Sequence, residues 1–173
     1  MKKMILASFI VLGMVQVNAQ TATLNVKLKP IQTLTVNTAQ QTVNLEYVTT
    51  ADYQDGVTAL KQDHLSVYST GGFQVQVKSA EAAMQTGTKT MQVSTIKIKA
   101  AAGSDAVGNA SYAPAISLSN QETTLLSSSN GAVNKKINVE YKGAGDNAYI
   151  DNYIAGQNPT AYTTTLTYTI VSQ

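Results

Sequence analysis

The stretch Ala161-Tyr-Thr-Thr-Thr-Leu-Thr-Tyr-Thr-Ile170 carries the clearest structural signal in this sequence. Its two tyrosines, Leu166 and Ile170 share one parity with Thr164, whereas Thr163, Thr165, Thr167 and Thr169 have the other parity. Successive side chains of a β-strand point to opposite faces, and aromatic and β-branched residues suit a pleated surface. The stretch is therefore predicted to be one long strand with an apolar face and a polar face.

The same alternation recurs through most of the chain, and no stretch has a convincing helical period. The runs lie at residues 22–29, 34–36, 43–47, 65–67, 73–77, 91–98, 116–118, 125–126 and 137–141, with longer loops predicted at 49–63 and 143–159.

Turn residues separate these runs. Gly71-Gly72 and Asn130-Gly131 are predicted to close β-hairpins, because such pairs adopt the backbone conformations that tight turns need. About nine or ten short strands separated by turns predict an all-β fold, an immunoglobulin-like sandwich of antiparallel strands.

The first residues have the three parts of a secretory signal peptide. Lys2 and Lys3 are followed by an apolar run at 4–17 and by Asn18-Ala19, which places compact side chains before a cut. Cleavage is predicted between Ala19 and Gln20. The run is short for a membrane span of about 20 residues, so no integral membrane segment is expected after cleavage. Residues 20–173 then form a single domain.

Composition excludes several classes of function. Every basic residue is lysine, and loss of Lys2 and Lys3 would leave ten lysines beside the ten acidic residues. A balanced chain without arginine disfavours nucleic-acid binding. The chain has no cysteine, which excludes disulfides, thiolate metal sites and a cysteine nucleophile.

Candidate chemical groups are few. The single histidine, His64, has no acid or nucleophile at a recognisable spacing, so it is predicted to lie at the surface or in a turn. Asp146, Asn147, Asp151 and Asn152 could offer oxygen ligands to calcium, but their spacing is irregular and solvated turn residues are the simpler interpretation. We expect no enzyme activity, no catalytic residues, no metal and no cofactor.

Nine tyrosines are numerous enough to suggest a recognition face. Those on apolar strand parity are predicted to be core residues. A ligand-binding loop is predicted at Tyr149, Asp151 and Tyr153, which lie outside the strands.

The two ends of the sequence resemble a known group of exported proteins. Residues 22–30 with 34–36, and the closing run 161–170, resemble spore-coat-U-like and fimbrial subunits, which are exported immunoglobulin-like sandwiches assembled by strand complementation. The closing run is also similar to WxL cell-wall-binding domains, and residues 65–77 are similar in layout to both groups. The cysteine pair of the first group and the tryptophan motif of the second are missing. The signal ending at Ala19 resembles those of Bacteroidetes-type Gram-negative exports.

The resemblance implies a role for residues 21–29. Leu24, Val26 and Leu28 share one face and would fill a groove in a neighbouring subunit while the backbone completes its sheet. The alternative is an ordinary edge strand that pairs within its own domain.

Two functions follow from these observations. The first is an exported structural or adhesive subunit, whose partners would be copies of itself or related subunits and an assembly chaperone. The second is a soluble carbohydrate- or cell-wall-binding module that recognises surface glycans. Both would work in the periplasm, at the cell surface or in the medium of a Gram-negative bacterium.

Overall fold

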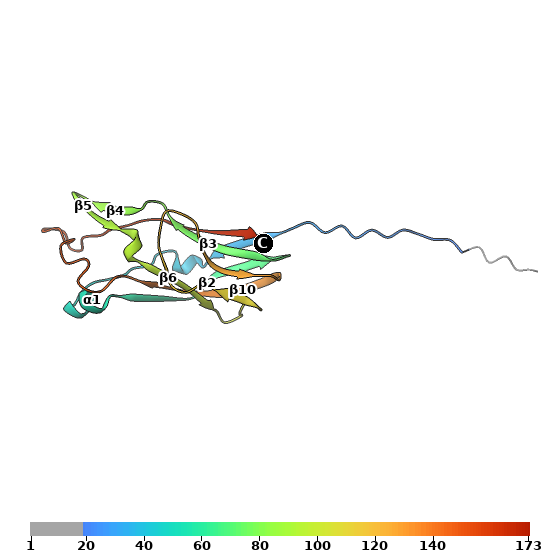
Figure 1. Ribbon diagram of the computed structural model, residues 1–173, viewed down its shortest axis with the longest axis horizontal. Coiled ribbons are helices and arrows are strands. Elements are labelled where there is room, and N and C mark those ends of the chain that lie inside the picture. The colour runs from blue at the N-terminus through green and yellow to red at the C-terminus, as the bar shows by residue number, and fades with distance from the viewer. Residues whose placement is uncertain (1–18) are drawn as a thin grey trace, which may run out of the picture.

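The computed structural model describes residues 19–173, which form an all-β sandwich with eleven strands (Figure 1). The predicted signal peptide lies outside these residues except for Ala19. Every strand pair is antiparallel. Among the described residues, no helix is both long and apolar enough to cross a membrane.

Two sheets make the sandwich, and a hairpin of β4 (Ala83–Thr86) and β5 (Lys89–Gln92) extends it. The five-stranded sheet has the order β1 (Gln32–Val36), β2 (Thr58–Ser69), β10 (Ala132–Lys142), β6 (Lys97–Ala102), β8 (Ile116–Ser117). The four-stranded sheet has the order β11 (Leu166–Ser172), β3 (Phe73–Ser79), β9 (Thr123–Ser128), β7 (Ala110–Tyr112).

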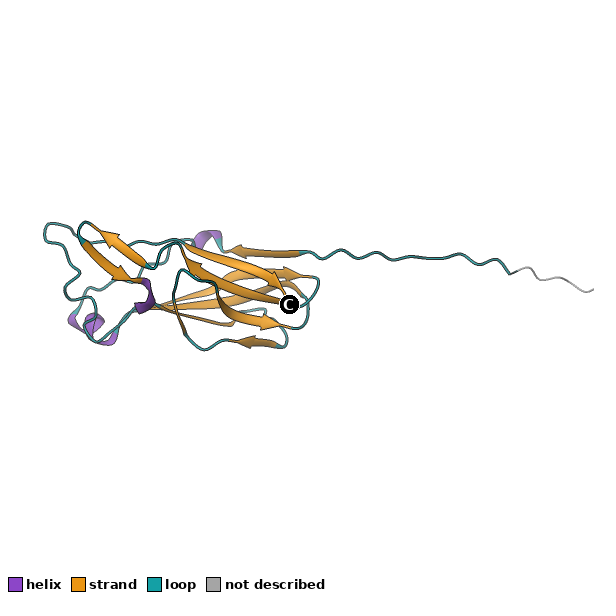
Figure 2. Cartoon of the chain, turned by 45° about the horizontal axis from the view of Figure 1, so that its top comes forward, coloured by secondary structure: helices purple, strands orange, loops and turns teal. Residues whose placement is uncertain are grey.

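The strands run along the long axis of the molecule, and the two ends differ (Figure 2). We call the end where β1 begins and β11 finishes the base; it also holds the turns at residues 70–72 and 129–131. We call the opposite end the tip; it consists of α1 (Thr50–Asp55), the β4–β5 hairpin and the loop at 143–160 (Figure 1).

The predicted hairpins at the base are wrong, because both glycine turns cross from one sheet to the other. β2 lies in the five-stranded sheet and β3 in the four-stranded one, and the same is true of β10 and β9. The two turns pack closely: a Cβ on Gly131 would come within 2.6 Å of the Ser69 carbonyl oxygen. Glycine is needed there for close approach of two backbones rather than for a tight hairpin.

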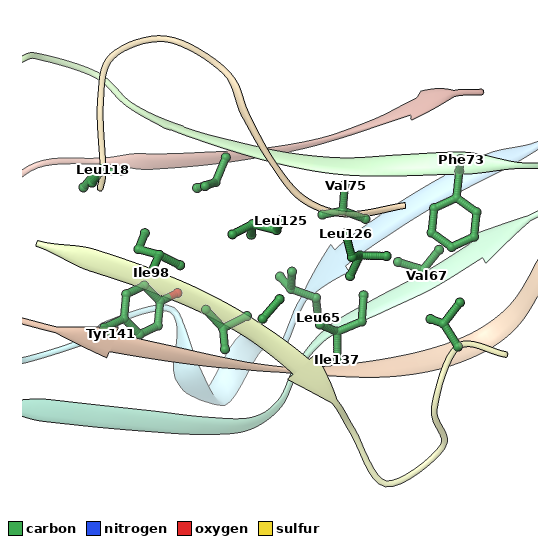
Figure 3. Packing of buried hydrophobic residues seen from close by; sticks show 14 of the residues in the cluster. Leu65, Val67, Phe73, Val75, Ile98, Leu118, Leu125, Leu126, Ile137 and Tyr141 are labelled. Atoms are coloured by element: carbon green, nitrogen blue, oxygen red, sulfur yellow. The ribbon is translucent and has the colours of Figure 1, made fainter. Parts of the chain in front are cut away.

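The core lies between the two sheets and is drawn from both (Figure 3). Leu125 and Leu126 are both fully buried although they are neighbours in one strand. A register shift opposite Val75 and Gln76 explains this, because an extra residue in β9 turns a second side chain inward. The largest fully buried apolar side chains are Phe73, Leu65, Ile98, Leu118, Leu125, Leu126, Ile137, Val67, Val75, Val77, Val93 and Val139.

The loop predicted at 49–63 contains a short helix and the first half of β2. Thr49 caps α1: its hydroxyl accepts a hydrogen bond from the Asp52 amide at 3.2 Å, and the Asp52 carboxylate accepts one from the Thr49 amide at 2.7 Å. This reciprocal capping box needs only local residues, so α1 forms without a helical hydrophobic period.

Candidate functional site

Residues 19–30 form an extended segment that belongs to no strand of the described sheets and points away from the base (Figure 1). We call it the extension. Its apolar side chains are almost fully exposed: Leu24 is 88 % exposed, Val26 76 % and Leu28 89 %. The edge-strand alternative, pairing within the same domain, is not what the structure shows. A strand-like segment thus presents an apolar face that contacts no other described part of the chain.

The extension is anchored where it meets the sandwich. The Ile31 carbonyl oxygen accepts a hydrogen bond from the Thr70 amide at 3.0 Å, and the Ile31 amide donates one to the Thr70 hydroxyl at 3.0 Å. Ordered pairing therefore begins immediately after Pro30. Proline has no backbone N–H to donate to a ladder. Pro30 is therefore suited to its position between the extension and β1.

We call the side of the sandwich between β1 and β11 the flank. β1 and β11 stand at the ends of their sheets, and no ladder joins them, although they lie close together at the base, where the Ser172 hydroxyl donates to Oε1 of Gln32 at 3.2 Å. Their core-facing side chains are only half-buried although they pack against the core. These residues are Leu34 and Val36 of β1 and Leu166, Tyr168 and Ile170 of β11.

The flank continues beyond both strands toward the tip. The runs at 43–47 and 162–165 were expected to be strands, and the alternating burial of the first is present, but neither forms a ladder. Val43, Leu45 and Tyr162 are half-buried against the same core. Both segments therefore carry half-buried apolar side chains but form no ladder with a strand among the described residues.

A buried polar chain links the two sheets beneath the flank. The Tyr168 hydroxyl of β11 is hydrogen-bonded to the Tyr141 hydroxyl of β10, which lies 2.8 Å from Nε2 of His64 in β2. Nδ1 of His64 lies 3.1 Å from Oε1 of Gln40, whose amide nitrogen donates to the Gln62 carbonyl at 2.9 Å.

The direction of these hydrogen bonds follows from the partners. Oε1 of Gln40 only accepts, so Nδ1 of His64 carries the proton and Nε2 accepts from Tyr141. Tyr141 in turn accepts from Tyr168. We call this set of four side chains the tyrosine–histidine relay.

Burial sets the protonation of the relay. Desolvation, with a smaller contribution from the charge of Lys61, lowers the pKa of His64 below its ordinary value of 6.5. Burial raises the pKa of Tyr141 to about 12 and also raises that of Tyr168. All members are therefore neutral near pH 7, as the hydrogen-bond directions require.

The prediction that His64 lies at the surface is wrong, since it is 2 % exposed. Its neighbour Asp63 has a positive φ of 49°, and the pairing of β2 with β10 changes register at this point. The bulge reverses side-chain parity, so His64 and Leu65 both face the core. Sequence periodicity gave no signal of the bulge.

Within residues 19–173, no group of three or more histidine or acidic side chains is placed to hold a metal ion. The relay joins two tyrosines, one histidine and one glutamine, and its hydrogen bonds fix the relative positions of the elements that carry these side chains.

The three residues of the predicted ligand-binding loop differ in burial. Tyr149 is only 7 % exposed; its ring packs edge-on against Tyr47 at 5.1 Å, and its hydroxyl lies 2.7 Å from that of Thr95. Tyr149 ties the loop to Tyr47 and Thr95 and has no free ring face for a ligand. Tyr153 is 56 % exposed, and Asp151 is exposed while its carbonyl accepts from Lys89 at 2.6 Å. The three residues do not share one binding face.

No protein-family model matches this chain, and no curated protein sequence matches it either. The fold and the site together define a β-sandwich whose flank carries half-buried apolar side chains and whose extension is apolar and exposed. Sequence reasoning identified the extension through Leu24, Val26 and Leu28. Sequence reasoning did not predict the flank. The only sequence signal for the flank is that Tyr162, Leu166 and Ile170 alternate as the residues of a paired strand do.

Proposed function

We propose that this protein is a structural subunit of a surface polymer, in which the extension of one copy adds a strand to the flank of the next. The proposal rests on two apolar surfaces that the same chain presents. One is a strand-like segment with exposed leucines and valine, and the other is a sandwich edge with half-buried apolar residues. Strand addition gives backbone hydrogen bonds for affinity and side-chain pockets for specificity.

The energetics favour a long-lived complex. Burying a leucine or valine side chain fully contributes about 1.5–3 kcal/mol, and Leu24, Val26 and Leu28 would all be buried on insertion. Hydrogen bonds to the free edge of β11 would add to this. Because such a strand dissociates only when the whole ladder opens, the polymer should separate slowly.

Exchange between copies is favoured over insertion into the same copy. Ile31 is held by its two hydrogen bonds to Thr70, and the extension points outward from there. To reach its own flank the chain would have to reverse direction within one or two residues at Pro30. A second copy accepts the extension in the extended conformation that it already has, so exchange between copies needs no change of backbone conformation.

Export, a surface location in a Gram-negative bacterium and kinship with fimbrial subunits belong to the same proposal. They rest on residues 1–19 and on the patterns at the two ends of the sequence. An assembly chaperone would cover the flank before polymerisation, because an open apolar edge promotes unwanted pairing. The glycan-binding alternative is not advanced, since Tyr149 has no free ring face.

A synthetic peptide tests the proposal. The peptide covers residues 20–31 and is added to the protein lacking residues 21–29. We expect saturable binding and a higher midpoint of thermal unfolding, because the peptide fills the flank. The control is the same peptide with Val26→Asp, which places a charge on the buried face. Equal binding of the two peptides, or no binding, would contradict the proposal.

A further inference from the structure

The outer face of the five-stranded sheet is rich in lysine. Successive side chains of a strand point to opposite faces, so the residues that alternate with the buried ones in β6 and β10 point away from the core. Four lysines occupy such positions: Lys97 and Lys99 of β6, and Lys136 and Lys142 of β10. All of them except Lys136 are exposed. We call this surface the lysine face.

The strand register places two of these lysines against each other. Lys97 lies directly opposite Lys142, and Lys99 lies directly opposite Glu140. Like charges at directly opposite positions destabilise a sheet. Within residues 19–173, Lys97, Lys99 and Lys142 form no ion pair. Such a face is suited to an anion that neutralises the opposed charges.

The outer face of the four-stranded sheet has a different character. Its outward positions on β11 and β3 include Thr167, Thr169 and Gln76, which are uncharged. Lys78 lies opposite Thr167, but its Nζ is already 3.3 Å from a carboxylate oxygen of Glu122. The two outer faces therefore differ in the positive charge that they offer to a partner.

Polar hollows adjoin the lysines on the lysine face. A hollow of about 490 Å³ is lined in part by Thr35, Ser66 and Lys136, which the register places side by side across β1, β2 and β10. A second hollow, of about 300 Å³, is lined by polar side chains that include Asn138. Asp63 lines both hollows. Hydroxyl, amide and carboxylate groups are the partners that sugar hydroxyls need.

An aromatic ring lies on the same face near the base. Tyr68 follows Ser66 by two positions in β2, so it points to the same side of the sheet. It is half-buried and pairs with Thr33 of β1, which is exposed. A tyrosine ring combines an apolar surface with a polar hydroxyl, which suits contact with a sugar ring.

The charged groups form a stripe along the strands. Lys136 and Lys142 are six residues apart in β10, a distance of about 20 Å along the strand. Lys97 and Lys99 lie beside the same strand. A linear anion lying along β10 would contact all four lysines, whereas a small anion would contact one or two.

An acidic polysaccharide fits this stripe better than a lipid surface or a nucleic acid. Surfaces that bind lipid carry apolar side chains that enter the bilayer, and Leu60 is the one large apolar side chain exposed beside Glu140 and Lys99. Nucleic-acid sites favour arginine, which the sequence lacks. Asp63 and Glu140 lie among the lysines and would repel closely spaced phosphates.

We propose that the lysine face binds a linear acidic polysaccharide. Lys97, Lys99 and Lys142 hold its carboxylate or sulfate groups, and the hollows beside Lys136 hold its hydroxyl groups. This surface is separate from the predicted loop at 149–153 and uses no residue of the extension or the flank. Copies joined in a polymer would present it repeatedly, which strengthens binding to a long chain.

Binding to immobilised polymers tests the proposal. The probes are polygalacturonate, which carries carboxylates, and dextran sulfate, with uncharged dextran as the blank. We expect saturable, salt-sensitive binding to one or both acidic polymers, which also identifies the preferred anionic group. The double variant Lys97→Gln/Lys142→Gln should bind about ten-fold more weakly. Its circular dichroism should be unchanged, because the substitution removes two like charges that face each other.

The matched control is Lys78→Gln/Lys89→Gln, which removes the same net charge from other places in the sandwich. It should bind within about two-fold of the unaltered protein, because neither lysine belongs to the lysine face. Equal weakening of the two double variants would show attraction by net charge alone and overturn the proposal. Absence of binding to both acidic polymers would overturn it as well.

Two further probes separate the polysaccharide from other polyanions. Double-stranded DNA and vesicles containing an acidic phospholipid are presented at the same ionic strength. Tighter binding of either one than of the acidic polysaccharides would overturn the assignment of the ligand. Tyr68→Ala should weaken binding to the polysaccharide, because it removes the ring from the face. An unchanged affinity in this variant would contradict contact with a sugar ring. None of these outcomes bears on strand exchange, which uses other residues.

Discussion

At the scale of single residues, the tyrosine–histidine relay is the most unusual feature of the sandwich. Buried hydroxyl and imidazole groups are tolerated when each is hydrogen-bonded, and a satisfied network fixes one arrangement of the surrounding elements. Here the network connects β2 and β10 of one sheet to β11 of the other, beside the flank. The relay therefore links the two sheets next to the flank.

Removing the middle hydroxyl should destabilise the fold. We expect Tyr141→Phe to lower the free energy of unfolding by about 1–3 kcal/mol, because His64 and Tyr168 would each lose a buried partner. Tyr112→Phe is the matched control, since the Tyr112 hydroxyl is buried without a hydrogen-bond partner and its loss should be neutral or stabilising. Urea unfolding measures both. Equal destabilisation of the two variants would show that the relay contributes nothing specific.

Stability should also fall in mild acid because of His64. Its pKa is lower in the folded protein than the ordinary value of 6.5, which we take for the unfolded chain. The unfolded state therefore binds a proton first, and the free energy of unfolding decreases as the pH drops below about 6.5 and levels off below the folded pKa. Above that range the group has no effect.

Thermal unfolding between pH 8 and pH 5 measures this effect, with His64→Gln as the comparison. His64 is the only histidine in the sequence, so the variant should lose most of the pH dependence in this window. The carboxylates of Asp52 and Asp63 have lowered pKa values through hydrogen bonds to their neighbours, and their loss of stability comes at lower pH. An unchanged profile in His64→Gln would refute the assignment.

At the scale of elements, the alternation of side chains predicts strands well but does not predict their partners. The period of two is a property of each strand alone, so β1, β3, β10 and the extension could be recognised from sequence. Pairing depends on residues far apart in the chain. Asn130-Gly131 was therefore mistaken for a hairpin, and residues 43–47 for a paired strand.

The candidate site, too, could be predicted from the sequence only in part. Leu24, Val26 and Leu28 were predicted as a donor face from local pattern, whereas the flank became visible only when β1 and β11 took their places at the sheet ends. Tyr149 was expected to be available to a ligand, but its burial depends on contacts with Tyr47 and Thr95, which are distant in sequence.

The face of the extension provides a prediction at this scale. Val26→Lys should abolish multimers, because it places a charge on the face that would enter the flank of another copy. Asn25→Lys adds the same charge to the opposite face and should leave assembly unchanged. Native gel electrophoresis of the two proteins makes the comparison. Loss of multimers in both variants would mean that charge alone, and not the buried face, controls assembly.

At the scale of the whole molecule, the chain is a sandwich with an apolar extension that pairs with none of its described strands. Apolar side chains gather on the extension and at both ends, while the side walls are nearly free of them. Exposed apolar side chains on an otherwise polar surface mark places where a partner can bind.

A donor-deficient copy should stop growth without disturbing the fold. Val26→Lys keeps an intact flank, so it can accept an extension but cannot donate one. Added to the unaltered protein at one part in five before assembly, it should shorten the multimers markedly, as seen by light scattering. Asn25→Lys at the same ratio should not change their length. Shortening by both variants, or by neither, would argue against directional growth.

The most direct test of strand exchange is the size distribution of the purified protein with and without residues 21–29. Light scattering and unboiled gel electrophoresis measure it, and circular dichroism checks that the shortened protein is folded. We predict a ladder of kinetically stable multimers for the intact protein and a folded monomer for the shortened one. A monomeric intact protein, or a ladder that survives the deletion, would contradict strand exchange.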